Sequence, residues 1–208
     1  VEGKSVTLVF DGAMSNAKVK VNGKDVGHWA FGYNSFHLCI DEAVKAGENT
    51  LQVNLENYPE SSRWYPGAGL FRNVHLVVTD KIHVPVWGTY ITTPNVKNDY
   101  ATVNVRTRIA GAAKGDKIEV RTQVLDANGK QVGENNTLHT INGDQPSIQN
   151  IVVSNPKLWT PETPYLYTVV TRLLKDGKER DCYSTRIGIR TIEFLPEKGF
   201  FLNGKVTK

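Results

Sequence analysis

The chain carries, at residues 18–26, the stretch Lys-Val-Lys-Val-Asn-Gly-Lys-Asp-Val. Apolar and polar residues alternate on either side of Asn22-Gly23, a dipeptide favoured in two-residue hairpin turns. Further pairs of this type follow along the sequence, among them Asn128-Gly129, Asp176-Gly177 and Asn203-Gly204. The pattern predicts antiparallel strands joined by tight turns along the whole chain.

The composition also favours strands. Val, Ile, Thr, Tyr, Phe and Trp together make up 72 of the 208 residues, and these types fit a pleated, half-buried surface. A helix is plausible only at residues 41–46, where Asp41 could cap one short turn and Gly47 could end it. The expected strands span residues 5–10, 17–22, 25–29, 36–40, 49–56, 71–79, 83–93, 100–110, 117–126, 130–134, 137–141, 147–154, 165–174 and 180–189.

Fourteen short strands exceed one ordinary sheet, so we expect an all-β protein built from two β-sandwich domains. The boundary is expected near Asp80-Lys81, after a loop at residues 60–69 that is rich in Gly, Ser and Pro. Residues 81–190 have the length and strand spacing of an immunoglobulin-like sandwich, in which Tyr165 or Tyr167 could supply a tyrosine corner. Residues 191–208 begin another hairpin.

Charge and cysteine usage exclude several classes of function. The net charge is +4 and the isoelectric point is 9.0, but no basic run of five residues occurs, so no nucleic-acid partner is expected. No apolar run is long enough to span a membrane as a helix. Cys39 and Cys182 lie too far apart for a zinc motif or a disulfide framework, and we expect two free thiols buried in strands.

The ends of the sequence bear on its origin. The chain starts with Val1 and continues directly into a predicted strand, without a signal peptide. We therefore expect a processed or excised form whose two ends are both cut, and the compartment stays open.

No motif for catalysis, a metal or a cofactor occurs in the sequence. The five histidines form no HExxH or HxH pair, and no nucleotide-binding or nucleophile-elbow motif is present. The informative segment is Arg63-Trp-Tyr-Pro-Gly-Ala-Gly-Leu-Phe-Arg-Asn-Val-His-Leu76. Arg63, Trp64, Tyr65 and Arg72 could face a sugar, because aromatic faces suit sugar C–H groups and guanidinium groups bind hydroxyls or carboxylates. Alternatively, they could pack against a neighbouring domain.

Three motifs carry a resemblance to a known family. The segment from Arg63 to Leu76 resembles the end of the N-terminal sugar-binding domain of glycoside hydrolase family 2, the β-galactosidase and β-glucuronidase family. Asn155-Pro-Lys-Leu-Trp-Thr-Pro-Glu-Thr-Pro-Tyr-Leu-Tyr167 is similar to the immunoglobulin-like domain of that family. Gly188-Ile-Arg190, followed by Phe200-Phe-Leu-Asn-Gly-Lys205, resembles its entry into the catalytic (β/α)₈ barrel.

The resemblance implies a domain order and a function. Residues 1–80 would be the C-terminal part of a jelly-roll sugar-binding domain, residues 81–190 the immunoglobulin-like domain, and residues 191–208 the lead into a barrel beyond Lys208. Family members are retaining glycosidases with two catalytic glutamates on the barrel, and no residue here matches either. We therefore expect the inactive N-terminal region of a retaining glycosidase, acting on terminal β-galactosides and secreted or periplasmic on family grounds. The alternative is a standalone carbohydrate-binding or immunoglobulin-like interaction module.

The resemblance also implies that a partial jelly roll must protect its core. Several apolar residues alternate as inward-facing positions would: Val6, Leu8, Phe10, Leu38, Ile40, Leu51, Val53 and Leu55. Half a jelly roll would leave some of them, and its strand edges, without partners. Carbohydrate and the barrel are the partners expected in the full-length enzyme, and self-association through residues 1–80 is expected for this chain.

Overall fold

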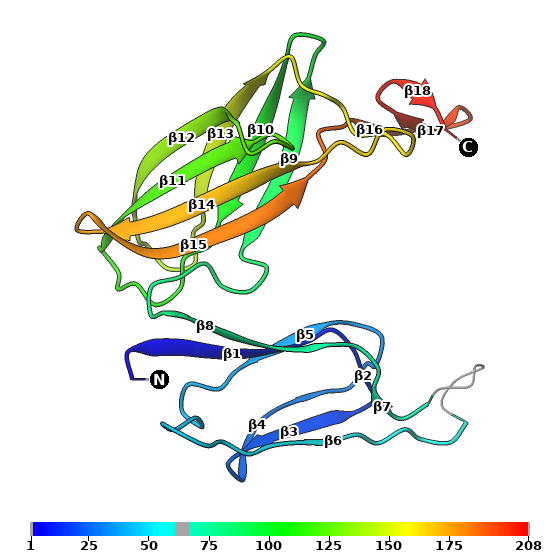
Figure 1. Ribbon diagram of the computed structural model, residues 1–208. Helices are drawn as coiled ribbons and strands as arrows, with labels where there is room; N and C mark the ends of the chain where they lie inside the picture. Colours follow the sequence, from blue (N-terminus) through cyan, green and yellow to red (C-terminus); the bar gives the residue numbers. More distant parts are fainter. Residues whose placement is uncertain (1, 61–66, 208) are drawn as a thin grey trace. The chain divides into compact units, whose positions relative to one another are not determined.

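The computed structural model describes residues 2–60 and 67–207, and every regular element within them is a β-strand (Figure 1). The chain divides into two compact units, Val1–Lys81 and Ile82–Lys208. The all-β fold class predicted from composition and hairpin signals is confirmed.

Among its described residues, the first unit has two three-stranded sheets and one short strand pair. One sheet has the order β5-β1-β8, from Phe36–Cys39, Lys4–Phe10 and Val74–Asp80. The other has the order β4-β3-β6, from Lys24–Trp29, Ala17–Val21 and Leu51–Asn54. The short strands β2 (Ala13–Met14) and β7 (Gly69–Leu70) pair at one end. The core lies on the inward-facing side chains of β1 and β3, including Val6, Leu8, Phe10, Val19 and Val21.

The second unit has the two sheets of an immunoglobulin-like sandwich. The three-stranded sheet has the order β13-β10-β9, from Ser147–Ser154, Tyr100–Thr107 and Thr89–Val96. The four-stranded sheet has the order β12-β11-β14-β15, from Gln131–Thr140, Lys117–Leu125, Tyr167–Lys175 and Lys178–Ile187. Its core contains two apolar clusters, one around Val103 and Ile151 and the other around Ile118 and Leu173.

Three of the predicted hairpin turns are two-residue turns, whereas at Asn128-Gly129 only Gly129 has a positive φ, of 80°, and the turn runs from Asp126 to Lys130. Asn22 and Gly23 join β3 to β4 with φ of 51° and 80°, and Asp176 and Gly177 join β14 to β15 with φ of 53° and 71°. Positive φ at both central residues is the requirement of the type I′ turn, which Asn-Gly and Asp-Gly meet at little cost. Asn203-Gly204 turns in the same way between β17 (Gly199–Leu202) and β18 (Lys205–Val206).

The tyrosine corner is formed by Tyr167. Its side chain is buried and its hydroxyl oxygen accepts a hydrogen bond from the Lys157 backbone N–H at 2.8 Å. Burial raises the pKa of the Tyr167 hydroxyl. Tyr165 packs edge-on against Tyr167, and its own hydroxyl accepts from the Ala127 N–H at 3.2 Å. The two tyrosines thereby fix the chain as it enters β14.

The last residues form a small three-stranded sheet, β16-β17-β18, in which β16 spans Ile192–Leu195. Asn203 attaches this sheet to the preceding chain. Its side chain accepts from the Thr191 N–H and donates to the Trp159 carbonyl, both at 3.0 Å.

Four local expectations were wrong. The two strands expected at residues 130–134 and 137–141 form one continuous strand, β12. Residues 41–46 form turns rather than a helix, because the Asp41 carboxylate accepts hydrogen bonds from Ser5 and from the Val6 N–H instead of capping its own segment. Residues 83–93 are not one strand. Gly88 donates to the Pro85 carbonyl at 2.7 Å, and this tight turn delays β9 until Thr89.

The two cysteines are the last correction. Cys39 and Cys182 lie in strands β5 and β15 and are free thiols, as expected, but both are exposed. Each occupies an outward-facing position of an alternating strand, where period-two geometry directs the side chain to solvent.

Candidate functional site

The sequence-predicted site falls only partly within the described residues. Arg63, Trp64 and Tyr65 lie outside them. Arg72 is described and lies at a bend between β7 and β8. Its guanidinium carbon is 5.2 Å from the centroid of the Phe71 ring, and its Nη1 donates to the Asp11 carbonyl at 3.5 Å. Arg72 is therefore held at the end of the first unit where β2 and β7 pair (Figure 1).

Asp11 joins three segments at this end. Its backbone N–H donates to the Asn73 carbonyl at 3.0 Å, and its own carbonyl accepts from the Ser35 hydroxyl at 3.1 Å. Its carboxylate lies 2.9 Å from Nε2 of His75. Residues 11–14, 31–35 and 69–75 are thus brought together around the end of β1.

Exposed aromatic side chains occupy the same end. Phe31 and Tyr33 are 56% and 48% exposed, and their ring centroids are 5.7 Å apart. Gly32 between them lies against Met14, which pairs with β7, while Phe71 lies against Gly12 and is 47% exposed. A Cβ at Gly12 would lie 2.6 Å from the Phe71 ring, so glycine permits this close approach.

We define the aromatic surface as Phe31, Tyr33, Phe71 and Arg72. Sequence reasoning identified only Arg72 of these four as a site residue. The available signal was the pair of aromatics in Phe31-Gly-Tyr33, inside a short turn-like stretch. Exposed aromatic groups of this kind mark interaction surfaces, and a guanidinium beside them adds hydrogen-bond donors for hydroxyl or carboxylate groups.

Glu56 and Tyr58 lie near β2, because the backbone of Glu56 is hydrogen-bonded to Ser15. The Glu56 N–H donates to the Ser15 carbonyl, one residue beyond β2. Tyr58 donates from its hydroxyl to the Glu56 carboxylate at 3.1 Å, and this hydrogen bond, with the carboxylate charge, raises the pKa of the Tyr58 hydroxyl. Tyr58 is therefore a neutral hydrogen-bonding group.

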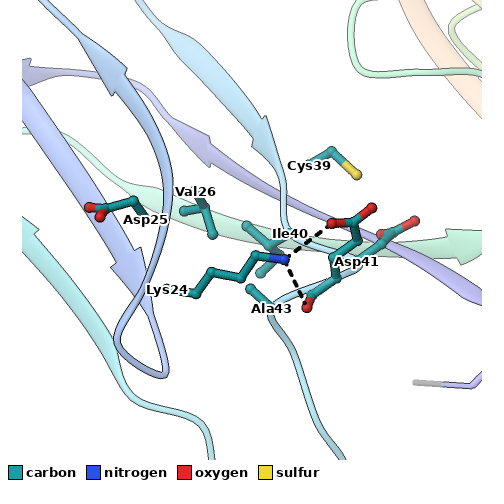
Figure 2. A pocket seen from close by; sticks show the side chains of 8 residues that line it. Lys24, Asp25, Val26, Cys39, Ile40, Asp41 and Ala43 are labelled. Atoms are coloured by element: carbon teal, nitrogen blue, oxygen red, sulfur yellow. Dashed lines mark hydrogen bonds and ion pairs between the residues drawn. The ribbon is translucent and has the colours of Figure 1, made fainter.

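The first unit also has a polar hollow that is open to solvent. Figure 2 shows Lys24 reaching from the β3–β4 hairpin toward the segment after β5, where it lies 3.1 Å from the Glu42 carboxylate. Cys39, Asp25 and Asp41 also line this hollow. Lys24 and Glu42 are largely solvent-exposed, and such exposed ion pairs contribute little energy.

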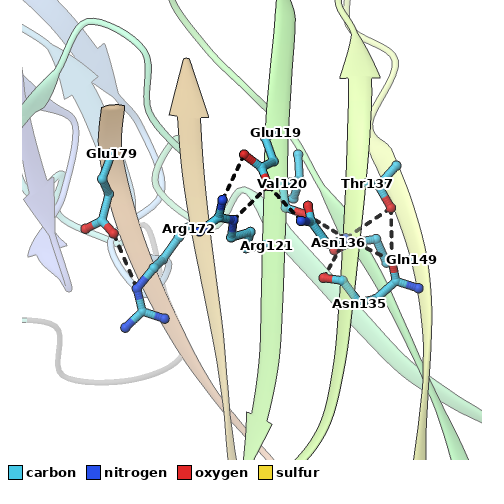
Figure 3. Close-up of polar contacts among 9 residues, drawn as sticks. All are labelled: Glu119, Val120, Arg121, Asn135, Asn136, Thr137, Gln149, Arg172 and Glu179. Atoms are coloured by element: carbon cyan, nitrogen blue, oxygen red, sulfur yellow. Dashed lines mark hydrogen bonds and ion pairs between the residues drawn. The ribbon is translucent and has the colours of Figure 1, made fainter. Parts of the chain in front are cut away.

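The outer face of the four-stranded sheet carries a set of paired polar groups (Figure 3). Arg121 binds Glu119 through two hydrogen bonds, of 2.7 and 3.2 Å, and Asn136 donates to the same carboxylate at 2.7 Å. Arg172 lies 3.4 Å from Glu179. These side chains satisfy one another, so this face is less suited to a ligand than the aromatic surface.

Two carboxyl groups of the second unit, those of Asp116 and Glu119, have a lowered pKa that favours the ionised form. The hydrogen bond from Lys175 lowers the pKa of Asp116, and the one from Arg121 lowers the pKa of Glu119. A glycosidase general acid needs the opposite shift. Neither group therefore has the character of a catalytic acid.

Searches for a metal centre and a membrane span concern the described residues alone. Within residues 2–60 and 67–207, no group of three or more His, Cys, Asp or Glu side chains is placed to hold a metal ion. The same residues contain no helix long and apolar enough to cross a membrane.

Comparison with known proteins places the chain in a family. Residues 83–190 match the family Glycosyl hydrolases family 2. The chain is 37% identical to the β-galactosidase BoGH2A of Bacteroides ovatus over 99% of its own length, and 36% identical to a putative β-glucuronidase of Formosa agariphila over the same share. It spans 25% and 19% of the lengths of these two relatives.

Solved structures agree with this assignment. A glycosyl hydrolase family 2 member from Bacteroides cellulosilyticus superposes on the whole chain with a TM-score of 0.93 at 37% identity, and the match covers 27% of that structure. A β-glucuronidase of the same family superposes on the whole chain with a TM-score of 0.89 at 27% identity, over 24% of its length. The chain belongs to glycosyl hydrolase family 2, as its three sequence motifs indicated.

Proposed function

We propose that this chain is a non-catalytic N-terminal region of a retaining β-galactosidase. The observation that carries the proposal is the match to a β-galactosidase over 99% of the chain but only a quarter of that relative's length. A retaining glycosidase needs two carboxyl groups about 5–5.5 Å apart across the scissile bond. We assign that pair to a (β/α)₈ barrel outside these 208 residues.

Each part of the chain has a role in this proposal. Residues 1–80 contribute part of a jelly-roll sugar-binding domain, residues 81–190 form the immunoglobulin-like domain, and residues 191–208 lead toward the barrel. The aromatic surface contacts either the terminal sugar or the barrel in the parent enzyme. Arg63, Trp64 and Tyr65 lie outside the described residues, and the sequence motif alone supports a role for them in this contact.

A second candidate function is favoured by the same aromatic surface. Exposed aromatic rings can stack on a sugar, and a neighbouring guanidinium group can donate hydrogen bonds to its hydroxyls. An autonomous carbohydrate-binding module could use the same groups. Such a module would bind β-galactosides as the isolated 208-residue chain. Isothermal titration of this chain with lactose separates the two functions, since our proposal expects no measurable binding without the barrel.

The experiment that tests specificity uses the full-length parent enzyme. We expect it to hydrolyse 4-nitrophenyl β-galactoside with a higher kcat/KM than 4-nitrophenyl β-glucuronide. A preference for the glucuronide would refute the galactoside assignment and leave the family unchanged.

A second measurement tests the aromatic surface in the same enzyme. Phe31→Ala and Phe71→Ala remove exposed rings, so they should leave the fold intact. We expect each to lower kcat/KM by about tenfold, equivalent to about 1.4 kcal/mol of transition-state stabilisation. Tyr100→Ala removes an exposed ring from the second unit and is the matched control. Equal effects of all three substitutions would contradict a specific role for the aromatic surface.

A further inference from the structure

The chain contains several asparagine residues that are followed directly by glycine. They are Asn22-Gly23, Asn128-Gly129, Asn142-Gly143 and Asn203-Gly204. In such a pair the glycine has no side chain that would hinder attack of its backbone nitrogen on the asparagine side-chain amide. The attack has two requirements: the side-chain amide must be able to turn toward the glycine, and the glycine N–H must not be held in a hydrogen bond. The four pairs differ in both.

Hydrogen bonds hold the side-chain amide of Asn22. Its Nδ2 donates to the Ala43 carbonyl and to Oδ1 of Asn49, both at 2.8 Å, and its Oδ1 accepts from the Thr50 N–H at 3.0 Å. These hydrogen bonds must break before the amide can turn toward Gly23. Asn22 is therefore protected through its side chain.

Asn203 is protected in the same way. Its Oδ1 accepts from the Thr191 N–H and its Nδ2 donates to the Trp159 carbonyl, both at 3.0 Å. Because these contacts attach the C-terminal sheet to the preceding chain, turning the amide would also detach that sheet.

Asn128 is protected through the nitrogen of its glycine. The Gly129 N–H donates to the Asp126 carbonyl at 3.0 Å inside the turn between β11 and β12. The Asp126 carboxylate also accepts from the N–H groups of Asn128 and Lys130, both at 2.9 Å, and holds this turn. A hydrogen bond to the protonated form of a group makes that group harder to deprotonate. The Gly129 nitrogen is therefore a poor nucleophile in the folded chain.

Asn142 meets both requirements. It lies between β12 and β13, and residues 142–145 are all exposed. Among the residues that the structure describes, neither the Asn142 side chain nor the Gly143 N–H has a hydrogen-bond partner. Gly143 has a φ of 64°, and no neighbouring atom lies within 4 Å of the position that a Cβ would occupy. The amide and the nitrogen are therefore unhindered at this pair.

We propose that Asn142 is a site of spontaneous deamidation in the folded chain. Base removes the proton of the Gly143 N–H, and the nitrogen forms a bond to Cγ of Asn142. The bond between Cγ and Nδ2 then breaks, so that ammonia leaves and a succinimide ring remains. Water opens the ring at Cγ to give aspartate, or at the main-chain carbonyl carbon to give isoaspartate, in which the chain runs through Cγ. One water is consumed for each ammonia released, and no oxidation or reduction occurs.

The loop accommodates either product. On one side Ile141 is buried, its N–H donates to the Asp116 carbonyl and its carbonyl accepts from the Gly115 N–H, both at 2.9 Å. On the other side β13 begins at Ser147, which is also buried. The additional backbone atom of isoaspartate lies between these two anchored ends. The modified chain therefore stays folded and differs in charge, because each event lowers the net charge of +4 by one.

Peptide mapping by mass spectrometry tests the proposal on the full 208-residue chain after incubation in mildly alkaline buffer. Fragmentation assigns the mass increase of an amide-to-carboxylate conversion to an individual asparagine. We expect Asn142 to react at least about tenfold faster than Asn22, Asn128 or Asn203, because a hydrogen bond that must break first slows the attack by about this factor.

Unfolding supplies an internal control. In concentrated urea the hydrogen bonds that protect the other three pairs are absent, so we expect all four pairs to react at similar rates. The rate at Asn142 should change little, whereas the other three rates should rise to meet it. The flanking residues are the same in both conditions, so this comparison isolates protection by the fold.

Substitution identifies the reacting residue by charge. Asn142→Gln lengthens the side chain and disfavours ring closure, so the acidic species that accumulates on ion-exchange chromatography should be lost. Asn128→Gln is the matched control, because Asn128 is also exposed and also precedes glycine. It should leave the acidic species unchanged.

Three results would overturn the proposal. They are faster reaction at any other asparagine of the folded chain, a rate at Asn142 that rises in urea as much as the other three rates, and acidic species that persist in Asn142→Gln.

Discussion

A buried glutamine connects the two sheets of the immunoglobulin-like unit, and its removal should destabilise that unit. Gln149 lies on β13 and is only 2% exposed. Its Oε1 accepts from the Thr122 hydroxyl at 2.6 Å. Its Nε2 donates to the Val120 carbonyl at 2.9 Å and to the Thr137 hydroxyl at 3.2 Å (Figure 3). Thr122 and Val120 belong to β11 of the facing sheet.

Gln149→Leu keeps most of the side-chain volume and removes these hydrogen bonds. The Thr122 hydroxyl then loses its hydrogen bond to Gln149, and its remaining hydrogen-bond partner is the Thr171 hydroxyl at 3.3 Å. A buried polar group left unsatisfied costs about 1–3 kcal/mol. We expect the free energy of unfolding of the second unit to fall by about 2 kcal/mol, which corresponds to a decrease in Tm of about 8 °C.

A double-mutant cycle separates the hydrogen bond from general packing. Thr122→Val removes the other partner and retains its shape, so Gln149→Leu with Thr122→Val leaves fewer unsatisfied groups than either single change. We expect the double variant to recover at least about 1 kcal/mol relative to the sum of the single variants. The assay is equilibrium urea unfolding of each variant, followed by circular dichroism. Additive losses, or a neutral Gln149→Leu, would refute this reasoning.

Three further predictions concern the second unit. Tyr167→Phe removes the acceptor of the Lys157 N–H and should lower the free energy of unfolding by about 1–2 kcal/mol in urea titrations, and an unchanged value would show that the tyrosine corner contributes nothing. Thr107→Val should raise the melting temperature, since the Thr107 hydroxyl is buried without a hydrogen-bond partner among the described residues, and a lower Tm would contradict this. The lowered pKa of Asp116, caused chiefly by Lys175, means that this carboxylate adds stability above its unfolded-state pKa and loses it as pH falls through the folded-state value. Asp116→Asn should therefore reduce stability at neutral pH and match the parent chain at strongly acidic pH, and a deficit independent of pH would count against the ion pair.

The strands and turns could be predicted where local chemistry determines them. Asn22-Gly23 and Asp176-Gly177 require positive φ, and few other dipeptides meet that need without strain. The start of β9 could not be placed, because the turn from Pro85 to Gly88 interrupts a sequence that reads as an uninterrupted apolar strand.

The sequence also did not show which face of β13 is buried. Ser147 and Gln149 face the core, while Ile148 and Val152 face solvent. Alternation indicates that two faces exist, but polar and apolar residues are present on both, so the pattern does not identify the buried one. Only the partners on β11 and β12 determine that Gln149 points inward.

The candidate site was predictable in part for a related reason. Arg72 belongs to a motif that is continuous in sequence, and its place among aromatic and glycine residues made it a candidate before any family resemblance was considered. The aromatic surface is assembled from residues 31–35 and 69–75, which meet only through the pairing of β2 with β7 and through Asp11. Such a convergence depends on tertiary contacts that no single stretch of sequence encodes.

The central claim is that the chain is a non-catalytic part of a family 2 glycosidase, and side-by-side hydrolysis of 4-nitrophenyl β-galactoside tests it most directly. The 208-residue chain and the full-length parent enzyme would be assayed at equal molar concentration, with the product anomer followed by NMR. Our account predicts that the parent releases galactose with retention of configuration and that the chain alone shows no turnover above background. Turnover by the purified chain that is abolished by substituting one of its own glutamates would contradict the account.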